Sequence, residues 1–232
     1  MHTDVRRALV LGGTGTVGSA VLRELARRGV TAVFTFHRSA DKAQVFAQEL
    51  GHTARQIDLR DPGATEAMLG TLEPVDVVIH CAGTSAGLAI PEVSTAAWHE
   101  AMTVNVHSAF LAVQWVARQD RRCDIVLVGG LDRTQSLPLP VHFAATQGAL
   151  SAMVMAAAHE LGRRDIRINL VALGPLDGGI SAGLAARRRK DYEAFSALRR
   201  VGKPEEAAKL IAWLALENSY IQGKVISANG GI

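Results

Sequence analysis

The chain of 232 residues has the length of a single α/β domain, and its 48% hydrophobic and 20% charged residues form an ordinary globular composition that argues against long disorder. The formal net charge is +3, and the arginines fall in short pairs without interleaved aromatic residues, so we expect no nucleic-acid partner. Cys81 and Cys123 lie in apolar runs, which argues against a disulfide framework. Neither a signal peptide nor a membrane-spanning stretch is evident, so we expect one cytoplasmic domain over residues 1–232, with no membrane contact and no metal.

Short aliphatic runs alternate with amphipathic segments along the chain, and this pattern predicts a parallel sheet buried between helices. Seven strands are expected in the runs RALVLG, TAVFTF, ARQID, VDVVIHCAG, DIVLVGG, IRINLVAL and KVISA. Helical periodicity covers residues 16–29, 40–50, 62–71, 95–119, 143–162 and 204–217. Together they predict a doubly wound, Rossmann-type α/β fold with a seven-stranded parallel sheet and helices on both faces.

A glycine-rich turn, LGGTGTVG, joins the first strand to the first helix, and Gly13, Gly15 and Gly18 have GxGxxG spacing. In this position the backbone can approach a pyrophosphate, whose charge the helix N-terminus then binds. The alternative is a tight turn without a ligand. The sequence therefore favours a dinucleotide site at the end of the first strand.

The second strand ends in FTFHRS, without the acidic residue that an NAD-binding unit places there for the ribose hydroxyls. Arg38 stands at that distance instead, between His37 and Ser39. A guanidinium group suits a 2′-phosphate, so NADP(H) is favoured over NAD(H). The alternative is that Arg38 is only a surface residue at a strand end.

One connection is longer than the others. Residues 174–203 carry two glycine-rich turns that flank a polar segment of helical character. Doubly wound sheets place a substrate lid after a strand end of this kind, so we expect a lid over this range.

Several motifs resemble those of one enzyme family at corresponding places along the chain. The turn over 12–18 is similar to TGxxxGxG, HCAG at 80–83 is similar to NNAG, and Asn105 matches an asparagine of the fourth helix. The stretch VGKPEEAAKLIAWLALENSYIQGKVISANGG resembles the family's C-terminal segment. From Val5 to Ile232 the chain resembles the short-chain dehydrogenases/reductases, and most of all the β-ketoacyl carrier-protein reductases.

The resemblance implies an NADP(H) site. Asp58–Leu59 matches the pair that touches adenine, and Gly174–Pro175 matches the turn near nicotinamide. The residues expected to contact the cofactor are Gly12, Gly13, Thr14, Gly15, Thr16, Val17, Gly18, His37, Arg38, Ser39, Asp58, Leu59, Cys81, Ala82, Gly83, Gln147, Gly174 and Pro175.

The catalytic positions depart from the family pattern. In the family a tyrosine protonates the ketone oxygen, a lysine four residues later lowers the pKa of the phenol, and a serine thirteen residues before the tyrosine orients the carbonyl. In HFAATQGAL these positions hold Phe143 and Gln147, and the serine position is Gly130. Of the four catalytic positions only Asn105 keeps the family's residue.

No other register restores the motif. Tyr220 and Lys224 have YxxxK spacing but belong to the segment before the last strand, and Ser136 lies only seven residues before Phe143. The Gln147 amide remains able to bind a ribose hydroxyl.

Substitute acids are Asp132, His142 and water. His142 is expected to point away from the Phe143 and Gln147 face of its helix, and the alternative for it and Asp132 is a solvent-facing residue. Asn105 is a catalytic candidate beside Asp132, although in the family it bonds backbone within the fourth helix. Cys81 is most simply a small buried residue.

The helices over 95–119 and 143–162 are apolar over more than one stripe. In the family they form a dimer interface, which implies a homodimer or homotetramer, or a heteromer with an active paralogue. Arg121 and Arg164 occupy places from which carrier-linked ketoreductases contact an acidic acyl carrier protein, with simple helix-end charges as the alternative.

Three functions stay open. The first is an NADP(H)-binding relative that has lost ketone reduction and serves as a non-redox catalyst or partner subunit near acyl or polyketide substrates. The second is a reductase with a substitute acid. The third is a silent NADP(H)-sensing module.

Overall fold

The computed structural model describes residues 6–119, 121–130 and 139–232. One parallel sheet has the strand order β3-β2-β1-β4-β5-β6-β7. The strands are β1 (Arg7–Leu11), β2 (Thr31–Phe36), β3 (Thr53–Gln56), β4 (Val77–His80), β5 (Cys123–Gly130), β6 (Ile166–Leu173) and β7 (Val225–Ala228). All seven predicted strands and the doubly wound topology are confirmed.

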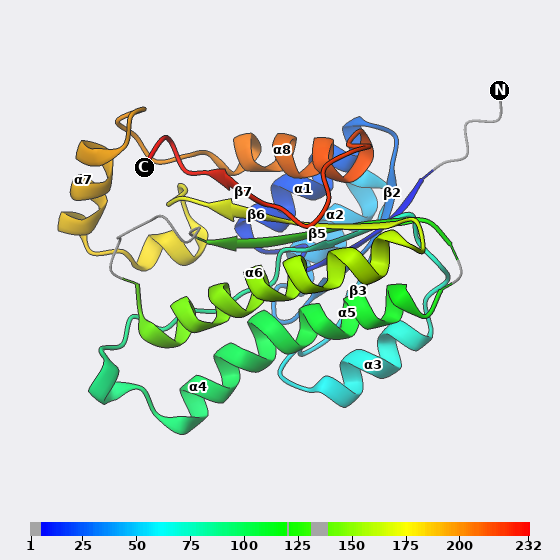
Figure 1. Ribbon diagram of the computed structural model, residues 1–232, viewed down its shortest axis with the longest axis horizontal. Helices are drawn as coiled ribbons and strands as arrows, with labels where there is room; N and C mark the ends of the chain where they lie inside the picture. The colour runs from blue at the N-terminus through cyan, green and yellow to red at the C-terminus, as the bar shows by residue number, and fades with distance from the viewer. Residues whose placement is uncertain (1–5, 120, 131–138) are drawn as a thin grey trace.

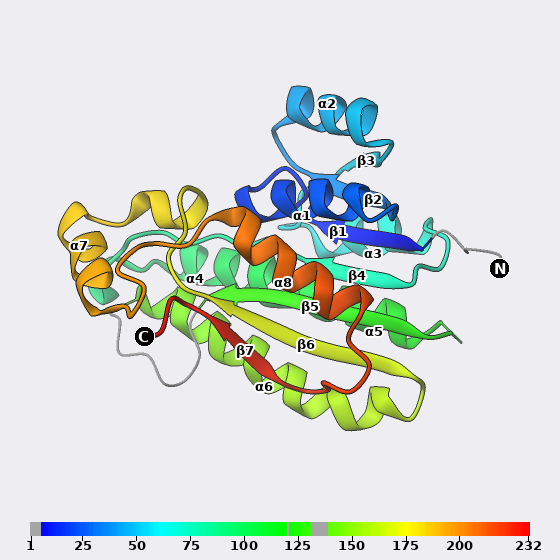
Figure 2. The same cartoon turned by 90° about the horizontal axis from the view of Figure 1, so that it is seen from above.

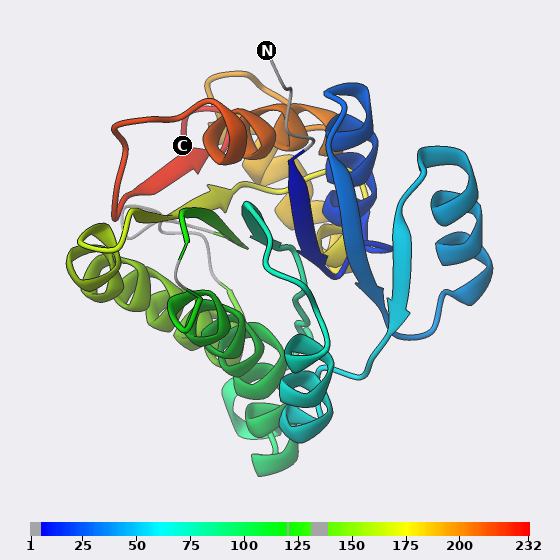
Figure 3. The ribbon, with the colours of Figure 1, turned by 90° about the vertical axis from the view of Figure 1, so that its right-hand side faces the viewer.

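Helices cover both faces of the sheet (Figures 1 and 3). One face carries α1 (Thr16–Arg27) and α8 (Pro204–Leu216), with α2 (Ala40–Leu50) beside the β3 edge (Figure 2). The other face carries α3 (Pro62–Gly70), α4 (Thr95–Met102), η2 (Thr103–His107), α5 (Ser108–Ala117) and α6 (Val141–Gly162). Shorter segments at the carboxyl ends of the strands are η1 (Ile90–Glu92), η3 (Gly179–Gly183) and α7 (Ala186–Phe195).

The strands are apolar on both sides because each face packs against helices. In β1, Val10 joins the core under α1 and α8, whereas Leu9 joins the core under α3, α5 and α6. Successive side chains of a strand point to opposite faces, so a continuous apolar run fills two cores. This is why RALVLG reads as an unbroken apolar run.

The predicted helix over 95–119 is present, but its interior is not regular α-helix and it ends two residues earlier than expected. A π-helical segment, η2, separates α4 from α5, and α5 ends at Ala117. The Ser108 hydroxyl donates to the Val104 carbonyl at 2.7 Å, and the Asn105 side chain bonds outside its own helix. Wider turns of this kind are frequent at functional sites.

Residues 174–203 contain η3 and α7, so the expected helical segment is present, at the carboxyl ends of β5 and β6 (Figure 1). Tyr192 of α7 is buried, and its hydroxyl donates to the Asn229 carbonyl beyond β7. The Leu198 N–H donates to the Gly230 carbonyl at 3.0 Å. These bonds attach the end of α7 to the C-terminal residues.

Within the described part of the chain, α6 is the helix with the length and apolar composition that crossing a membrane requires. It packs along β6, with Leu150 and Val154 buried on its inner face. Its outer face leaves the Met155 side chain 44% exposed. The apolar character of α6 therefore has two sources, a core face and an unpartnered outer face.

Candidate functional site

The glycine-rich turn is held between β2 and β4. Gly12 has φ +81°, and a Cβ there would lie 2.8 Å from the Ala82 backbone, so only glycine fits. The Gly12 N–H donates to the Thr35 hydroxyl at 2.9 Å, and the Gly13 N–H donates to the Thr35 carbonyl at 2.8 Å. Helix α1 starts directly after Gly15, which has no side chain to cap it. Its N-terminus is thus open to an anion.

The segment over residues 174–203, which the sequence predicts to be a lid, lies over part of this turn. Gly178 and Gly179 lie against the Thr16 side chain at the start of α1, and Ile180 lies above Gly83. The structure therefore brings together the predicted turn, the residues after β4 and the first residues of the lid. A bound dinucleotide would lie between them.

Basic side chains gather beside the turn. His37, Arg38 and Ser39 are exposed between β2 and α2, at the place expected for the adenosine end of a dinucleotide. Lys42 of α2 donates to the Thr14 carbonyl at 2.8 Å. Burial, and secondarily the nearby Arg23, lowers the pKa of Lys42. Lys42 was missed by sequence reasoning, because its contact with Thr14 joins α2 to a turn that lies 28 residues away along the chain.

Asp58 lies after β3, as expected, but its carboxylate already has a partner. Arg60 donates to both oxygens, at 3.0 and 2.7 Å, and His37 Nε2 lies 3.5 Å away. The hydrogen bonds from Arg60 hold the pKa of Asp58 at about 2, despite partial burial. An adenine amine at Asp58 would share this carboxylate with Arg60.

Phe143 and Gly130 face each other where the family has a phenol and a hydroxyl. A Cβ at Gly130 would lie 3.5 Å from the Phe143 ring, so the two positions keep contact distance. Phe143 is buried. No proton donor is therefore contributed by either residue to the space between them.

Gln147 bonds β5. Its Oε1 accepts from the Gly130 N–H at 2.8 Å, and its Nε2 donates to the Thr146 hydroxyl at 3.1 Å. A Cβ at Gly129 would lie only 2.5 Å from that Oε1, so the missing side chain at Gly129 gives the amide its room. One N–H of the Gln147 amide has no assigned partner and is left for the predicted hydrogen bond to a ribose hydroxyl.

Asn105 is bonded to other segments, which corrects the expectation of a bond within its helix. Its Oδ1 accepts from the Thr84 N–H at 2.7 Å, and its Nδ2 donates to the Thr84 carbonyl at 2.9 Å and to the Thr146 hydroxyl at 3.1 Å. Both amide hydrogens are thus used. Thr146 in turn donates to the Phe143 carbonyl at 2.7 Å, so it joins Asn105 and Gln147 in one buried network.

His142 is 2% exposed, so the expectation of a solvent-facing residue is wrong. The reason is that the loop after β4 packs on the start of α6, where the Ala86 N–H donates to His142 Nε2 at 3.3 Å. An accepting Nε2 places the proton of the neutral ring on Nδ1, which has no hydrogen-bond partner among the described residues. Asp132 and Ser136 lie outside the described residues.

His80 and Cys81 replace the family's two amides. His80 Nε2 lies 2.7 Å from the Ser108 hydroxyl, which is itself a donor to Val104, so the imidazole donates. Burial lowers the pKa of His80 to about 4 and raises that of the Cys81 thiol to about 12. Both groups are neutral at pH 7, and Cys81 is no thiolate nucleophile.

Tyr220 and Lys224 belong to the connection between α8 and β7 and are not residues of α6. Tyr220 is 96% exposed. Their YxxxK spacing is accidental.

Comparison with known proteins agrees with this geometry. The family model described as Enoyl-(Acyl carrier protein) reductase matches residues 13–232. The chain is 29% identical over 228 residues to the cyclic-di-GMP-binding biofilm dispersal mediator protein of Escherichia coli, with 97% of this chain and 96% of that protein covered. It is 27% identical over 235 residues to the 3-oxoacyl-(acyl-carrier-protein) reductase MabA of Mycobacterium bovis, with 98% and 92% covered.

Among solved structures, BdcA in complex with NADPH superposes with a TM-score of 0.91 at 28% identity, covering 98% of this chain and 94% of that one. The similarity extends over the sheet, the turn and the C-terminal segment together. The chain is therefore a member of the short-chain dehydrogenase/reductase family, similar to the ketoacyl carrier-protein reductases.

Proposed function

We propose that this chain binds NADP(H) between the glycine-rich turn and the lid. The open N-terminus of α1 suits the pyrophosphate, and Arg38 with Lys42 suits a 2′-phosphate. BdcA has the same fold and forms a complex with NADPH, which supports this assignment. The remaining contacts would come from the residues after β4 and from Gly174–Pro175.

We propose further that the chain has lost the usual ketone reduction and acts as a non-redox catalyst or a partner subunit in acyl or polyketide metabolism. The observation that carries this is the buried network that binds Gln147 to Gly130 and Asn105 to Thr84. The network uses both amide hydrogens of Asn105 and one of Gln147, and the Phe143 ring that faces Gly130 has no proton to donate. Loss of a positioned general acid alone costs about 10²- to 10⁴-fold in rate.

Two other functions remain as alternatives. A reductase with a substitute acid would draw on Asp132, on water or on His142, whose Nδ1 has no hydrogen-bond partner among the described residues. A sensing module without turnover is favoured by the relative in Escherichia coli, whose name describes a nucleotide-binding mediator. Neither alternative explains the loss of three catalytic groups as simply.

The assembly proposed is a homodimer or homotetramer, or a heteromer with an active paralogue, through α4, α5 and α6. Exposed apolar side chains on these helices support it: Trp98, Phe110 and Met155. A carrier protein would dock through Arg121 and Arg164, both exposed, although Arg121 is already paired with Asp76. We place the protein in the cytoplasm.

Fluorescence titration with NADPH tests the binding half of the proposal, and saturation is expected. Incubation with 4-deuterated NADPH and a panel of β-ketoacyl thioesters tests the chemical half, with no label expected in the product. Failure of every dinucleotide to bind would overturn the cofactor assignment. Label transfer at a useful rate would support the substitute-acid alternative instead.

A further inference from the structure

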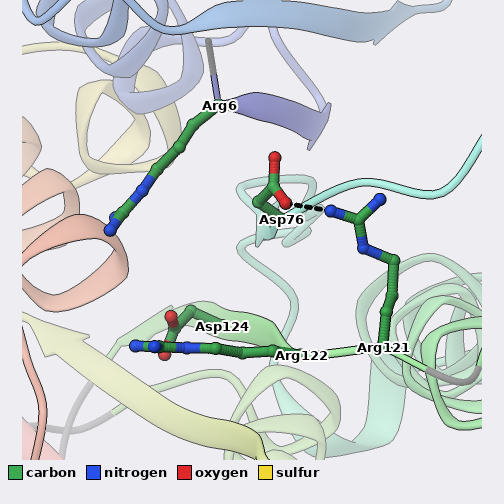
Figure 4. Close-up of a pocket in the computed structure, with 5 residues that line it drawn as sticks. All are labelled: Arg6, Asp76, Arg121, Arg122 and Asp124. Atoms are coloured by element: carbon green, nitrogen blue, oxygen red, sulfur yellow. Dashed lines mark hydrogen bonds and ion pairs between the residues drawn. The ribbon is translucent and has the colours of Figure 1, made fainter. Parts of the chain in front are cut away.

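A cavity lies at the amino-terminal edge of the sheet. It has a volume of about 320 Å³ and is lined by Arg6, Asp76, Arg121, Arg122 and Asp124 (Figure 4). These residues stand at or just before the first residues of β1, β4 and β5. The glycine-rich turn follows the other end of β1, so this cavity is separate from the dinucleotide site.

Each of the two carboxylates in the cavity is bonded to one guanidinium. Asp76 accepts from the Arg7 N–H at 2.9 Å and from the Arg121 side chain. Asp124 is 6% exposed, and its two oxygens lie 2.7 and 2.8 Å from the guanidinium of Arg167, its partner in register on β6. The acidic groups of the cavity are thus neutralised.

Two further arginines have no carboxylate of their own. Arg6 donates to the Leu216 carbonyl, a neutral acceptor at the end of α8, at 2.5 Å. Arg122 extends alongside Asp124 and makes no hydrogen bond within the described residues (Figure 4). The lining holds three guanidinium groups and two carboxylates. Arg167 lies outside the lining but pairs with Asp124, so the whole group carries two unbalanced positive charges.

We propose that this cavity binds a small phosphate-bearing dianion. A guanidinium group offers paired N–H donors that match phosphate oxygens, and the surplus of two charges matches a phosphate monoester. The buried Asp124 carboxylate lies in the lining and is held from β6 by the Arg167 guanidinium. The cavity has room for a phosphate with a small organic group.

The cavity lies at the amino ends of the strands, whereas the proposed dinucleotide site lies at their carboxyl ends. We therefore assign its ligand as an effector and not as the substrate. Ligands of doubly wound sheets normally bind outside the carboxyl ends of the strands. Occupation of this cavity would hold together the starts of β1, β4 and β5. The inference does not depend on whether the chain binds NADP(H).

Arginine side-chain NMR of the whole protein tests the inference, with inorganic phosphate and pyrophosphate as probes at constant ionic strength. Spectra are recorded with and without saturating NADP⁺, so that pyrophosphate binding at the glycine-rich turn is identified separately. The Nε–H signals of Arg6 and Arg122, assigned through Arg6→Gln and Arg122→Gln, should shift saturably with both probes. Arg122→Gln should weaken the binding of pyrophosphate about tenfold, the loss of one charge-assisted hydrogen-bond pair.

The control is Arg187→Gln, which removes an exposed arginine of α7 at the other end of the sheet. It should leave the affinity unchanged. Unsaturable shifts, equal affinity in wild type and Arg122→Gln, or an equal loss in Arg187→Gln would each overturn the proposal.

Discussion

The amide oxygen of Gln147 accepts a hydrogen bond from the backbone N–H of Gly130 at 2.8 Å. Gln147, which the sequence pattern aligns with the family's lysine, is therefore bonded to the strand that carries Gly130, which the pattern aligns with the family's serine. This hydrogen bond joins α6 to β5 through groups that carry neither a charge nor a hydroxyl. It also makes the neighbouring glycine necessary, because Gly129 gives the amide its room.

Gly129→Ala should lower the free energy of unfolding by about 1–3 kcal/mol, because its Cβ would displace the Gln147 amide. Gly130→Ala is the matched control, since its Cβ would meet the Phe143 ring at an ordinary 3.5 Å, and it should change stability by less than about 1 kcal/mol. Urea unfolding measures both. Equal stability of the two variants would show that Gln147 does not need the space at Gly129.

Thr146→Val should destabilise the protein by about 2–3 kcal/mol, because it leaves buried N–H groups of Asn105 and Gln147 without their acceptor. Thr146→Ser keeps the hydroxyl and should cost less than about 1 kcal/mol. Thermal unfolding at one pH compares them. If valine were tolerated as well as serine, the network would not hold the site together.

His80 should make stability depend on pH. Its folded pKa of about 4 lies below the unfolded value of about 6.5, so the unfolded chain binds the proton first as the pH falls. The contribution of the neutral imidazole is complete above pH 6.5 and is lost between pH 6.5 and about 4, by roughly 3 kcal/mol in all. Urea unfolding at pH 7.5, 6.0 and 5.0 measures this slope, and His80→Asn should flatten it. A slope unchanged in that variant would assign the dependence to other groups.

Glu24 should make stability depend on pH in a lower pH range than His80 does. Hydrogen bonds from Arg27 and then Arg28 outweigh its burial and hold its pKa at about 2, below the ordinary 4.5. The stabilisation is therefore present above pH 4.5 and is lost as the pH falls toward 2. Glu24→Gln should lower stability at pH 7 by about 1 kcal/mol and narrow the difference from wild type at pH 3. A constant difference at both pH values would contradict this.

Lys42→Gln and Arg38→Gln should each weaken NADPH binding about tenfold and leave NADH binding nearly unchanged, because only NADPH carries the 2′-phosphate. Fluorescence titration measures both cofactors. Arg163→Gln, which removes an exposed arginine at the C-terminal end of α6, is the control for the loss of charge alone. An equal loss of affinity for NADPH and for NADH would mean that these residues contact the pyrophosphate or stabilise the fold.

The sequence predicted the strands well because buried parallel strands are unbroken aliphatic runs, as in β1 and β6. It also placed the turn at Gly12 to Gly18, since glycine is required there by local backbone geometry. It did not predict the burial of His142 or the attachment of Gln147 to β5, because both depend on tertiary neighbours, Ala86 and Gly129. The π-helical segment around Asn105 was missed for the same reason: its side-chain partners belong to other segments.

The central claim is that the chain keeps a dinucleotide pocket whose proton-transfer groups are gone. The most direct measurement compares deuterium transfer from 4-deuterated NADPH to β-ketoacyl thioesters by wild type and by the variant Gly130→Ser, Phe143→Tyr, Gln147→Lys. We expect NADPH to bind both proteins, and we expect the variant to transfer label to the product at least about 10²-fold faster than wild type. Rapid transfer by wild type, unchanged or slower in the variant, would contradict the account.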